Sequence, residues 1–311
     1  MELIRGLHNL RPEHKGCVAT IGAFDGVHHG HQMVLQHLMD KANEFGCPSV
    51  VTVFEPLPRE YFSPLDAPAR IMSFREKFGA LDAMGIDRLL RIRFHEGLRK
   101  MRAQQAVEEI FVAGLGVRHV VLGDDWRFGR DREGDLALLQ LLGKQHGFTA
   151  ESADTLKVKG QRVSSTRVRD ALGQADFVLA EQLLGRPYSM AGRVVVGRQL
   201  GRTLGAPTAN LELRRLRAPL SGVYAVQVHG AGPRVAHGVA NVGTRPTVED
   251  SVKANLEVHL LDFDDDIYGR TIEVIFHHKL RDEKKFESVD VLKQQIKQDQ
   301  ERGRAYFGLS K

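Results

Sequence analysis

The sequence predicts an α/β fold in which a parallel sheet with helices is followed by a small antiparallel β-barrel and a C-terminal helix. Two observations predict it. In the first half, short apolar runs rich in β-branched residues alternate with helical patterns, which is typical of a parallel sheet. After about residue 184, short alternating runs separated by turn residues follow one another directly, which is typical of a small barrel.

The first half contains the elements of a parallel sheet. We expect strands at Cys17–Gly22, Ser49–Phe54, Leu89–Ile92 and His119–Leu122. We expect helices at His31–Phe45, Phe74–Met84 and Gln104–Ala113. Ligands bind beyond the carboxyl ends of the strands in such sheets, so the loops that follow these strands are the candidate site.

The second half contains the elements of a barrel. We expect strands at Gly192–Val196, Val223–Val228, Val235–Val242, Leu256–Leu261 and Ile272–Phe276. A closing helix is predicted at about Val289–Tyr306, where Leu292 and Ile296 lie on one face. The change of pattern places the boundary at Leu184–Tyr188, and the predicted domains are residues 1–184 and 187–311.

The composition favours a cytoplasmic protein that binds an anionic ligand. The chain has 311 residues, a net charge of +5 and two cysteines, Cys17 and Cys47, which argues against a disulfide framework. Residues 1–11 lack the apolar stretch of a signal peptide, and no run approaches the roughly 18 apolar residues of a membrane span. The positive charge suits a phosphorylated small molecule or a nucleic acid, and net charge alone does not separate them.

The segment Gly22–His31 (GAFDGVHHGH) is the strongest candidate for a phosphate site. It follows a predicted strand and opens a predicted helix, where backbone N–H groups and the helix dipole attract anions. Three glycines, Gly22, Gly26 and Gly30, allow close approach of a ligand, and His28 and His31 can present donors to one phosphate. A Gly-rich turn with surface histidines and a zinc site are the alternatives, and no zinc-like spacing of further ligands supports the second.

Three further segments of the first half carry polar or rigid residues near predicted element ends. Pro56 and Pro58 stiffen the loop after Phe54, which suits a wall of a site or a plain connector. Asp124 and Asp125 follow a strand and suit ribose or adenine binding or a helix cap. The hydroxyls of Ser164, Ser165 and Thr166 suit a helix cap, but the neighbouring Arg167 and Arg169 suit a triphosphate.

The second half contains one glycine-rich loop. Gly197, Gly201 and Gly205 recur at every fourth position, and Pro207, Thr208 and Asn210 follow them, which argues for a flap-like loop rather than a helix. Gly-Lys-Ser/Thr does not occur, so this is not a Walker A loop. A surface loop with Pro-Thr turn chemistry is the alternative.

The first half resembles the nucleotidyltransferase domain of bacterial bifunctional riboflavin kinase/FAD synthetases. Gly22–His31 resembles its HxGH-type loop, and Phe54–Pro58, Gly123–Gly129 and Val163–Arg169 resemble its other motifs in order and spacing. The resemblance implies a Rossmann-like domain in which ATP and its phosphates contact Gly22, Phe24, Asp25, Gly26, His28, Gly30, His31, Ser164, Ser165, Thr166 and Arg167. It also implies that nucleotide or flavin contacts Phe54, Pro56, Pro58, Asp124, Asp125, Trp126, Arg127 and Phe128, although Trp126 stands where the family usually has phenylalanine.

The second half resembles the riboflavin kinase domain of the same family, chiefly through G-R-x-L-G…P-T-A-N. The resemblance implies that Gly197, Gly201, Arg202, Gly205, Pro207, Thr208 and Asn210 bind ATP, and that Thr208 and Asn210 hold Mg²⁺. It implies that Glu257 accepts the proton of the riboflavin hydroxyl, although an outward glutamate on a half-buried strand is the plainer interpretation. Arg245 and Arg281 are weaker candidates for phosphate or flavin contacts.

The resemblance therefore implies two reactions, phosphorylation of riboflavin to FMN and adenylation of FMN to FAD, with riboflavin, FMN and ATP as small-molecule partners. The FMN phosphate is already ionised, so adenylyl transfer needs positioning and charge stabilisation rather than a general base. No nucleic acid or membrane partner is expected. The alternative is a nucleotidyltransferase for another acceptor whose barrel binds nucleic acid. The oligomeric state is left open.

Overall fold

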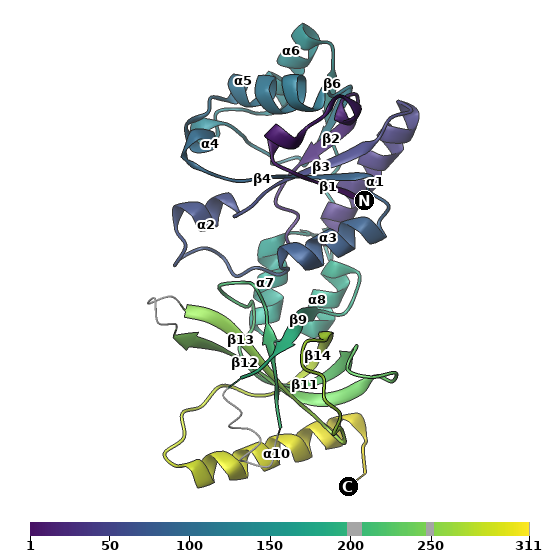
Figure 1. The fold of residues 1–311 in the computed structure, drawn as a ribbon. Helices are drawn as coiled ribbons and strands as arrows, with labels where there is room; N and C mark the ends of the chain where they lie inside the picture. Colours follow the sequence, from purple (N-terminus) through teal and green to yellow (C-terminus); the bar gives the residue numbers. More distant parts are fainter. Residues whose placement is uncertain (198–206, 247–251, 311) are drawn as a thin grey trace. The chain divides into compact units, whose positions relative to one another are not determined.

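The computed structural model describes residues 1–197, 207–246 and 252–310 (Figure 1). Within these residues the chain forms two compact units. The first consists of Met1–Pro68 and Phe74–Ser164, and the second of Ala69–Ser73 and Ser165–Lys311. In the parts of the chain that the model covers, no helix has the length and apolar character needed to cross a membrane.

The first unit is built on a parallel sheet, as predicted. Its strands are β1 (Glu2–Arg5), β2 (Val18–Ile21), β3 (Ser49–Phe54), β4 (Arg88–Ile92), β5 (His119–Leu122) and β6 (Thr149–Ser152). They lie in the order β1-β4-β3-β2-β5-β6, and each neighbouring pair is parallel. The edge strands β1 and β6 were not predicted, because both are short and carry polar residues that give no apolar run.

Helices cover both faces of this sheet, which is why every residue of β2 is buried. The helices are α1 (His29–Glu44), α2 (Pro58–Phe62), α3 (Phe74–Ala83), α4 (Glu96–Lys100), α5 (Ala103–Ala106), the π-helix η3 (Val107–Leu115) and α6 (Leu136–His146), with short 3-10 turns η1 (Leu7–Asn9), η2 (Pro12–His14) and η4 (Arg130–Arg132). On one face, η3 and α6 pack on strand residues such as Ala19 and Val120 in the main apolar cluster. α1 packs on β2, β3 and β5 through Val34, Leu35 and Leu38.

Two helices differ from their predicted bounds by two residues at one end, for local reasons. The predicted helix at Gln104–Ala113 is α5 continued by η3, and it ends at Gly116, whose φ of 51° is left-handed. The predicted helix at His31–Phe45 begins two residues earlier, at His29, because the His28 side chain caps it.

The second unit is a closed barrel, again as predicted. Its strands are β9 (Ser189–Val195), β10 (Ala209–Glu212), β11 (Gly222–His229), β12 (Ala236–Pro246), β13 (Val252–Leu260) and β14 (Thr271–Arg281), and a separate hairpin of the first unit is formed by β7 (Lys157–Val158) and β8 (Gln161–Arg162). The barrel order is β10-β13-β12-β11-β14-β9, with antiparallel neighbours. Of the barrel strands that the structure describes, β10 alone was not predicted, because it has four residues and begins two positions after Pro207.

Among the described residues, three helices belong to the barrel unit. α7 (Ser165–Gly173) and α8 (Phe177–Leu184) precede the barrel in the chain, and α10 (Val289–Phe307) follows it. α10 confirms the predicted closing helix and packs on β11, β12 and β14 (Figure 1). Ser288 caps its N-terminus by accepting a hydrogen bond from the Val291 N–H.

The segment Ala69–Ser73 is held in the barrel unit by buried hydrogen bonds. Arg215, 5% exposed, donates to the carbonyls of Arg70 and Ile71 at 3.3 and 3.0 Å. The Tyr188 hydroxyl donates to the Ile71 carbonyl at 3.2 Å. This short piece of the N-terminal half is therefore part of the barrel unit's own packing.

Candidate active sites

The sheet brings three of the predicted site segments to one edge of the first unit. β2 lies between β3 and β5, and the chain direction of all three is the same. Gly22–His28 follows β2, Glu55–Pro58 follows β3, and Gly123–Phe128 follows β5. From β2 the chain adds β3 and β4 on one side of the sheet and then β5 and β6 on the other. Open α/β sheets bind ligands at such a reversal of strand order, so these loops meet at the expected position.

The loop after β2 has a constrained backbone. Phe24 and Val27 have φ values of 45° and 41°, and Gly26 has 91°. Phe24 and Val27 are also buried, at 3% and 1% exposure. Left-handed conformations at non-glycine residues cost free energy and persist only where the surrounding packing imposes them, which is common at functional loops.

His28 and His31 lie face to face at the start of α1. Their rings are stacked with centroids 3.6 Å apart and an interplanar angle of 13°. The His28 Nδ1 atom accepts a hydrogen bond from the His31 N–H at 3.2 Å. A neutral His28 ring therefore carries its proton on Nε2, where it is a donor.

The glycines of this loop leave room for those rings. A Cβ atom at Gly30 would lie 3.3 Å from the His28 ring and 3.3 Å from the Val163 carbonyl. A Cβ atom at Gly22 would lie 3.0 Å from the Phe24 ring. Asp25, which was also predicted in this site, is 2% exposed within the same turn.

The loop after β5 is a network of charged and aromatic side chains. Arg162 of β8 pairs with Asp124 at 2.5 Å and with Asp125 at 2.8 Å, so these carboxylates do not cap a helix. The rings of Trp126 and Phe128 stack with centroids 4.5 Å apart. Tryptophan thus fits the aromatic position of the family motif.

Asp135 and Thr155 complete this network. Asp135 caps α6 and pairs with Arg127 at 2.7 Å, and together these contacts hold the pKa of Asp135 below its ordinary value, the hydrogen bond from the Leu138 N–H being the larger cause. The Thr155 hydroxyl donates to Asp124. Arg127 is therefore engaged in an ion pair in this structure.

The loop after β3 carries an aromatic cluster. Phe54 packs edge-on against Phe94 at 5.6 Å, and Tyr61 and Phe62 of α2 contact the same ring at 5.3 and 5.7 Å. Tyr61 and Phe62 are 37% and 54% exposed. Pro58 begins α2, and the Glu55–Pro56 peptide is cis.

The segment Ser164–Arg167 lies where the two compact units divide. Ser164 belongs to the first unit, whereas Ser165, Thr166 and Arg167 begin α7 in the second. The predicted role of these residues on the ATP phosphates stays a prediction.

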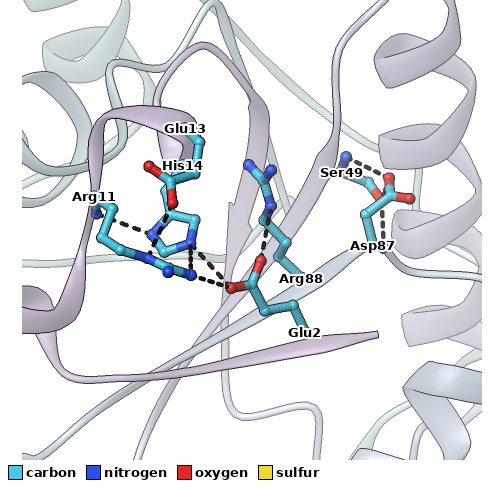
Figure 2. Close-up of polar contacts among 7 residues, drawn as sticks. All are labelled: Glu2, Arg11, Glu13, His14, Ser49, Asp87 and Arg88. Carbon is cyan, nitrogen blue, oxygen red and sulfur yellow. Dashed lines mark hydrogen bonds and ion pairs between the residues drawn. The ribbon is translucent and has the colours of Figure 1, made fainter.

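A polar cluster occupies the opposite ends of the strands. Figure 2 shows Glu2, Arg11, His14 and Arg88 gathered at the start of β1 and β4, and Asp87 bonded to Ser49 at the start of β3. The motif residues described above follow the strands rather than precede them. This cluster therefore lies at the end of the sheet away from the loops that carry the motif residues.

In the barrel unit, strand register places three polar residues side by side. Glu257 of β13 lies opposite Asn210 of β10 on one side and opposite Asn241 of β12 on the other. The neighbouring Leu256 and Val258 are fully buried, so Glu257 points to the other surface of its strand, as the alternation predicts. The Asn255 amide donates to Glu257 Oε1 at 3.0 Å.

Thr208 lines a cavity of 310 Å³ at one end of the barrel. Pro207, Val258, Leu260 and Tyr268 also line it, together with three consecutive aspartates at 264–266. His259 bonds the Pro207 carbonyl through Nδ1 at 2.9 Å, and burial lowers the pKa of this histidine. The Pro207–Asn210 segment is thereby fixed to β13.

The remaining predicted residues of the barrel have different positions. A Cβ atom at Gly197 would collide with the Asn210 amide, so the glycine is required for that approach. Arg281 makes a buried ion pair with Asp299 of α10 at 2.7 Å. Gly201, Arg202 and Gly205 lie outside the described residues, and only the backbone of Arg245 is described.

Sequence reasoning did not single out two cations of the first unit. Lys77 of α3 is 1% exposed and donates to the Ala23 carbonyl in the loop after β2. Arg162 pairs with Asp124 and Asp125. Both contacts join residues more than thirty positions apart, so no local pattern indicates them. Within the described ranges, no group of three or more His, Cys, Asp or Glu is arranged to hold a metal ion.

Comparison with known proteins agrees with this geometry. The FAD synthetase family model matches residues 10–167, and the riboflavin kinase family model matches residues 184–307. A bifunctional riboflavin kinase/FMN adenylyltransferase of Pseudomonas fluorescens is 54% identical and covers 98% of this chain and 97% of its own. The protein of that description from Escherichia coli (strain K12) is 48% identical, over 100% of this chain and 99% of its own.

One solved structure matches along nearly the whole chain. It is described as a macrolide-efflux protein from Streptococcus pneumoniae. Its TM-score is 0.77 at 30% sequence identity, and the match covers 98% of this chain and 99% of that chain. The efflux description belongs to that protein. The fold is shared.

The fold and these matches define a two-domain transferase that handles nucleotides and phosphate. The chain belongs to the bifunctional riboflavin kinase/FMN adenylyltransferase family. It phosphorylates riboflavin to FMN and transfers an adenylyl group from ATP to FMN, giving FAD and pyrophosphate. These matches favour the flavin reactions over the alternative of a nucleotidyltransferase for another acceptor.

Proposed function

We propose that each reaction has its own set of residues. Adenylyl transfer is assigned to residues 1–184, with the loop Gly22–His31 on the ATP phosphates. Riboflavin phosphorylation is assigned to residues 187–311, with Glu257, Asn210 and Thr208. The observation that carries the second assignment is the register that sets Glu257 beside Asn210.

In the first site, a phosphate oxygen of FMN attacks the α-phosphorus of ATP, and the bond to pyrophosphate breaks. The attacking oxygen is already ionised, so no residue has to accept a proton. His28 and His31 at the N-terminus of α1 offer donors where charge develops, and a donor of this kind is worth about 100-fold in rate. The buried turn before them supports a rigid site.

The loops after β3 and β5 are proposed to bind the base and the flavin. The exposed rings of Tyr61 and Phe62, with Phe54, form an aromatic surface suited to a flat ring system. Trp126 and Phe128 offer a second stacked pair beside Asp124 and Asp125.

In the second site, the riboflavin 5′-hydroxyl attacks the γ-phosphorus of ATP, the bond to ADP breaks, and the hydroxyl proton must be taken up. Glu257 is the carboxylate placed to accept it. Thr208 and Asn210 supply neutral oxygen donors, which suit Mg²⁺, and Mg²⁺ when bound neutralises phosphate charge. The cavity beside Thr208 is proposed to receive the nucleotide.

We propose a cytoplasmic setting for the chain from its cysteines. Both cysteines are free thiols, and burial raises the pKa of Cys17 to about 12, so a reducing cytoplasm suits the chain. The partners are riboflavin, FMN and ATP, and the absence of a nucleic-acid partner stays a prediction.

The test uses two variants of the full chain, each assayed for both reactions with Mg²⁺ present. His28→Ala should lose FAD formation from FMN and keep FMN formation from riboflavin, whereas Glu257→Gln should do the reverse. His8→Ala and Glu273→Gln are matched controls, since His8 bonds Asn9 and Glu273 bonds Ser189, both in exposed contacts. Loss of both reactions in either variant, with the controls active, would overturn the assignment.

A further inference from the structure

Lys77 is a charged side chain buried beneath the loop after β2. It lies in α3 and is 1% exposed, with Leu81 as the neighbouring buried residue of the same helix. Its ammonium donates to the Ala23 carbonyl at 2.6 Å. This contact joins α3 to the turn that precedes His28.

The contact falls at the point where the loop backbone changes direction. Ala23 precedes Phe24, which has the left-handed φ of 45°. At the other end of the turn, the Gln32 side-chain amide donates to the Val27 carbonyl at 2.9 Å. Side chains therefore hold the carbonyl that precedes Phe24 and the carbonyl of Val27, the two non-glycine residues of the turn with left-handed φ values.

Burying a lysine costs free energy unless its ammonium group makes a compensating interaction. Removing an ammonium from water is strongly unfavourable, and a leucine or methionine would fill the same space with no such penalty. A short hydrogen bond from a charged donor is stronger than one from a neutral donor. Lys77 also places positive charge directly beside a segment assigned to phosphate.

We propose that Lys77 is a positioning residue for adenylyl transfer, which holds the Ala23 carbonyl and so fixes the turn that presents His28 and the start of α1 to ATP. The proposal rests on the proposed role of the Gly22–His31 loop. The hydrogen bond supplies the geometry, and the charge makes the site more favourable for the polyphosphate. Lys77 does not itself need to contact the substrate.

The experiment compares Lys77→Met and Lys77→Arg with the wild type and with Lys41→Met. Lys41 is a matched control because it lies in the same unit, on α1, and pairs with Glu44 at the surface. FAD formation from FMN is measured over a range of ATP concentrations. Riboflavin phosphorylation by the same preparation and thermal unfolding report whether the chain is folded.

For Lys77→Met we expect a fall of about 100-fold in kcat/KM for ATP in FAD formation, the size that a misplacement of about 1 Å in a catalytic group can cause. Both a higher KM and a lower kcat should contribute, because the loop binds ATP and stabilises the transferring group. Kinase activity should be unchanged. Lys77→Arg keeps charge and donor and should recover part of the loss, and Lys41→Met should match the wild type.

The outcomes separate this inference from the proposed function. If the wild type forms FAD, His28→Ala does not, and folded Lys77→Met remains as active as the wild type, the positioning role is wrong. A lower melting temperature with normal kinetics would show a role in stability only, which also overturns it. If Lys77→Met does not fold, Lys77→Gln takes its place. It keeps a donor but removes the charge, so we expect a smaller fall in kcat/KM for ATP than for Lys77→Met, and wild-type kinetics in the folded variant would overturn the proposal. If His28→Ala itself forms FAD normally, the proposed function fails first.

Discussion

The Asn255 side-chain amide donates a hydrogen bond to Oε1 of Glu257 at 3.0 Å. The two residues are two positions apart on β13, so they lie on the same surface of the strand. A hydrogen bond from a side-chain amide restricts the orientation of a carboxylate. Asn255 thus holds Glu257 Oε1 in a fixed position on this surface of β13.

Asn255→Ala should slow riboflavin phosphorylation. The variant removes the amide that bonds Glu257 Oε1, so the carboxylate loses a contact that fixes its orientation. Because misplacing a catalytic group by about 1 Å can cost about 100-fold in rate, we expect kcat of the kinase reaction to fall by up to about that factor. FAD formation from FMN by the same variant is the control and should be unchanged. An unchanged kcat of the kinase reaction would argue against a positioning role of Asn255 for Glu257.

Arg281 and Asp299 should contribute to the stability of the barrel unit. Their side chains are 13% and 5% exposed, and Nε and Nη2 of Arg281 both donate to the carboxylate. Asp299→Ala leaves a buried guanidinium without this partner and should lower the free energy of unfolding by about 3 kcal/mol. The double variant Arg281→Met with Asp299→Leu should lose less, as measured by denaturant unfolding. Equal losses would contradict the unpaired-charge explanation.

The polar cluster of Figure 2 should make the first unit less stable in acid. The hydrogen bond from His14, and then the charges of His14, Arg88 and Arg11, lower the pKa of Glu2 from its ordinary 4.5, although burial opposes them. Because the folded value is the lower one, this stabilisation is complete above the ordinary pKa and is lost as the pH falls through the folded pKa. Glu2→Gln should therefore be less stable than the wild type at neutral pH.

Thermal unfolding of Glu2→Gln at several pH values checks this sign. The difference from the wild type should shrink as the solution is acidified. A difference that grows in acid would contradict it.

The sequence predicts those parts of the site that depend on neighbouring residues. The loop Gly22–His31 was predicted because glycines, histidines and a helix start lie within ten residues. The strand around Glu257 was predicted because apolar and polar residues alternate within it. The pairing of Glu257 with Asn210 depends on the register of the barrel strands, which no local pattern contains.

Contacts between distant residues account for what the sequence did not show. In the sequence, nothing distinguishes Lys77 from an ordinary exposed lysine of a helix, and only the fold brings it to Ala23. No residue near Arg281 in the sequence indicates its partner, and only the packing of α10 brings Asp299 to it. Asp124 likewise meets Arg162 through the hairpin β7–β8, which is too short to give a strand pattern.

The most direct test of two separate sites is complementation between two inactive chains. His28→Ala and Glu257→Gln are each incubated with riboflavin, ATP and Mg²⁺, alone and mixed, and the flavins are separated by chromatography. We expect His28→Ala alone to stop at FMN, Glu257→Gln alone to leave riboflavin, and the mixture to form FAD through FMN released into solution. Two results would contradict this. If Glu257→Gln converts added FMN to FAD but the mixture accumulates FMN and forms no FAD, FMN is not transferred through solution. If Glu257→Gln cannot use added FMN, the two sites are not independent.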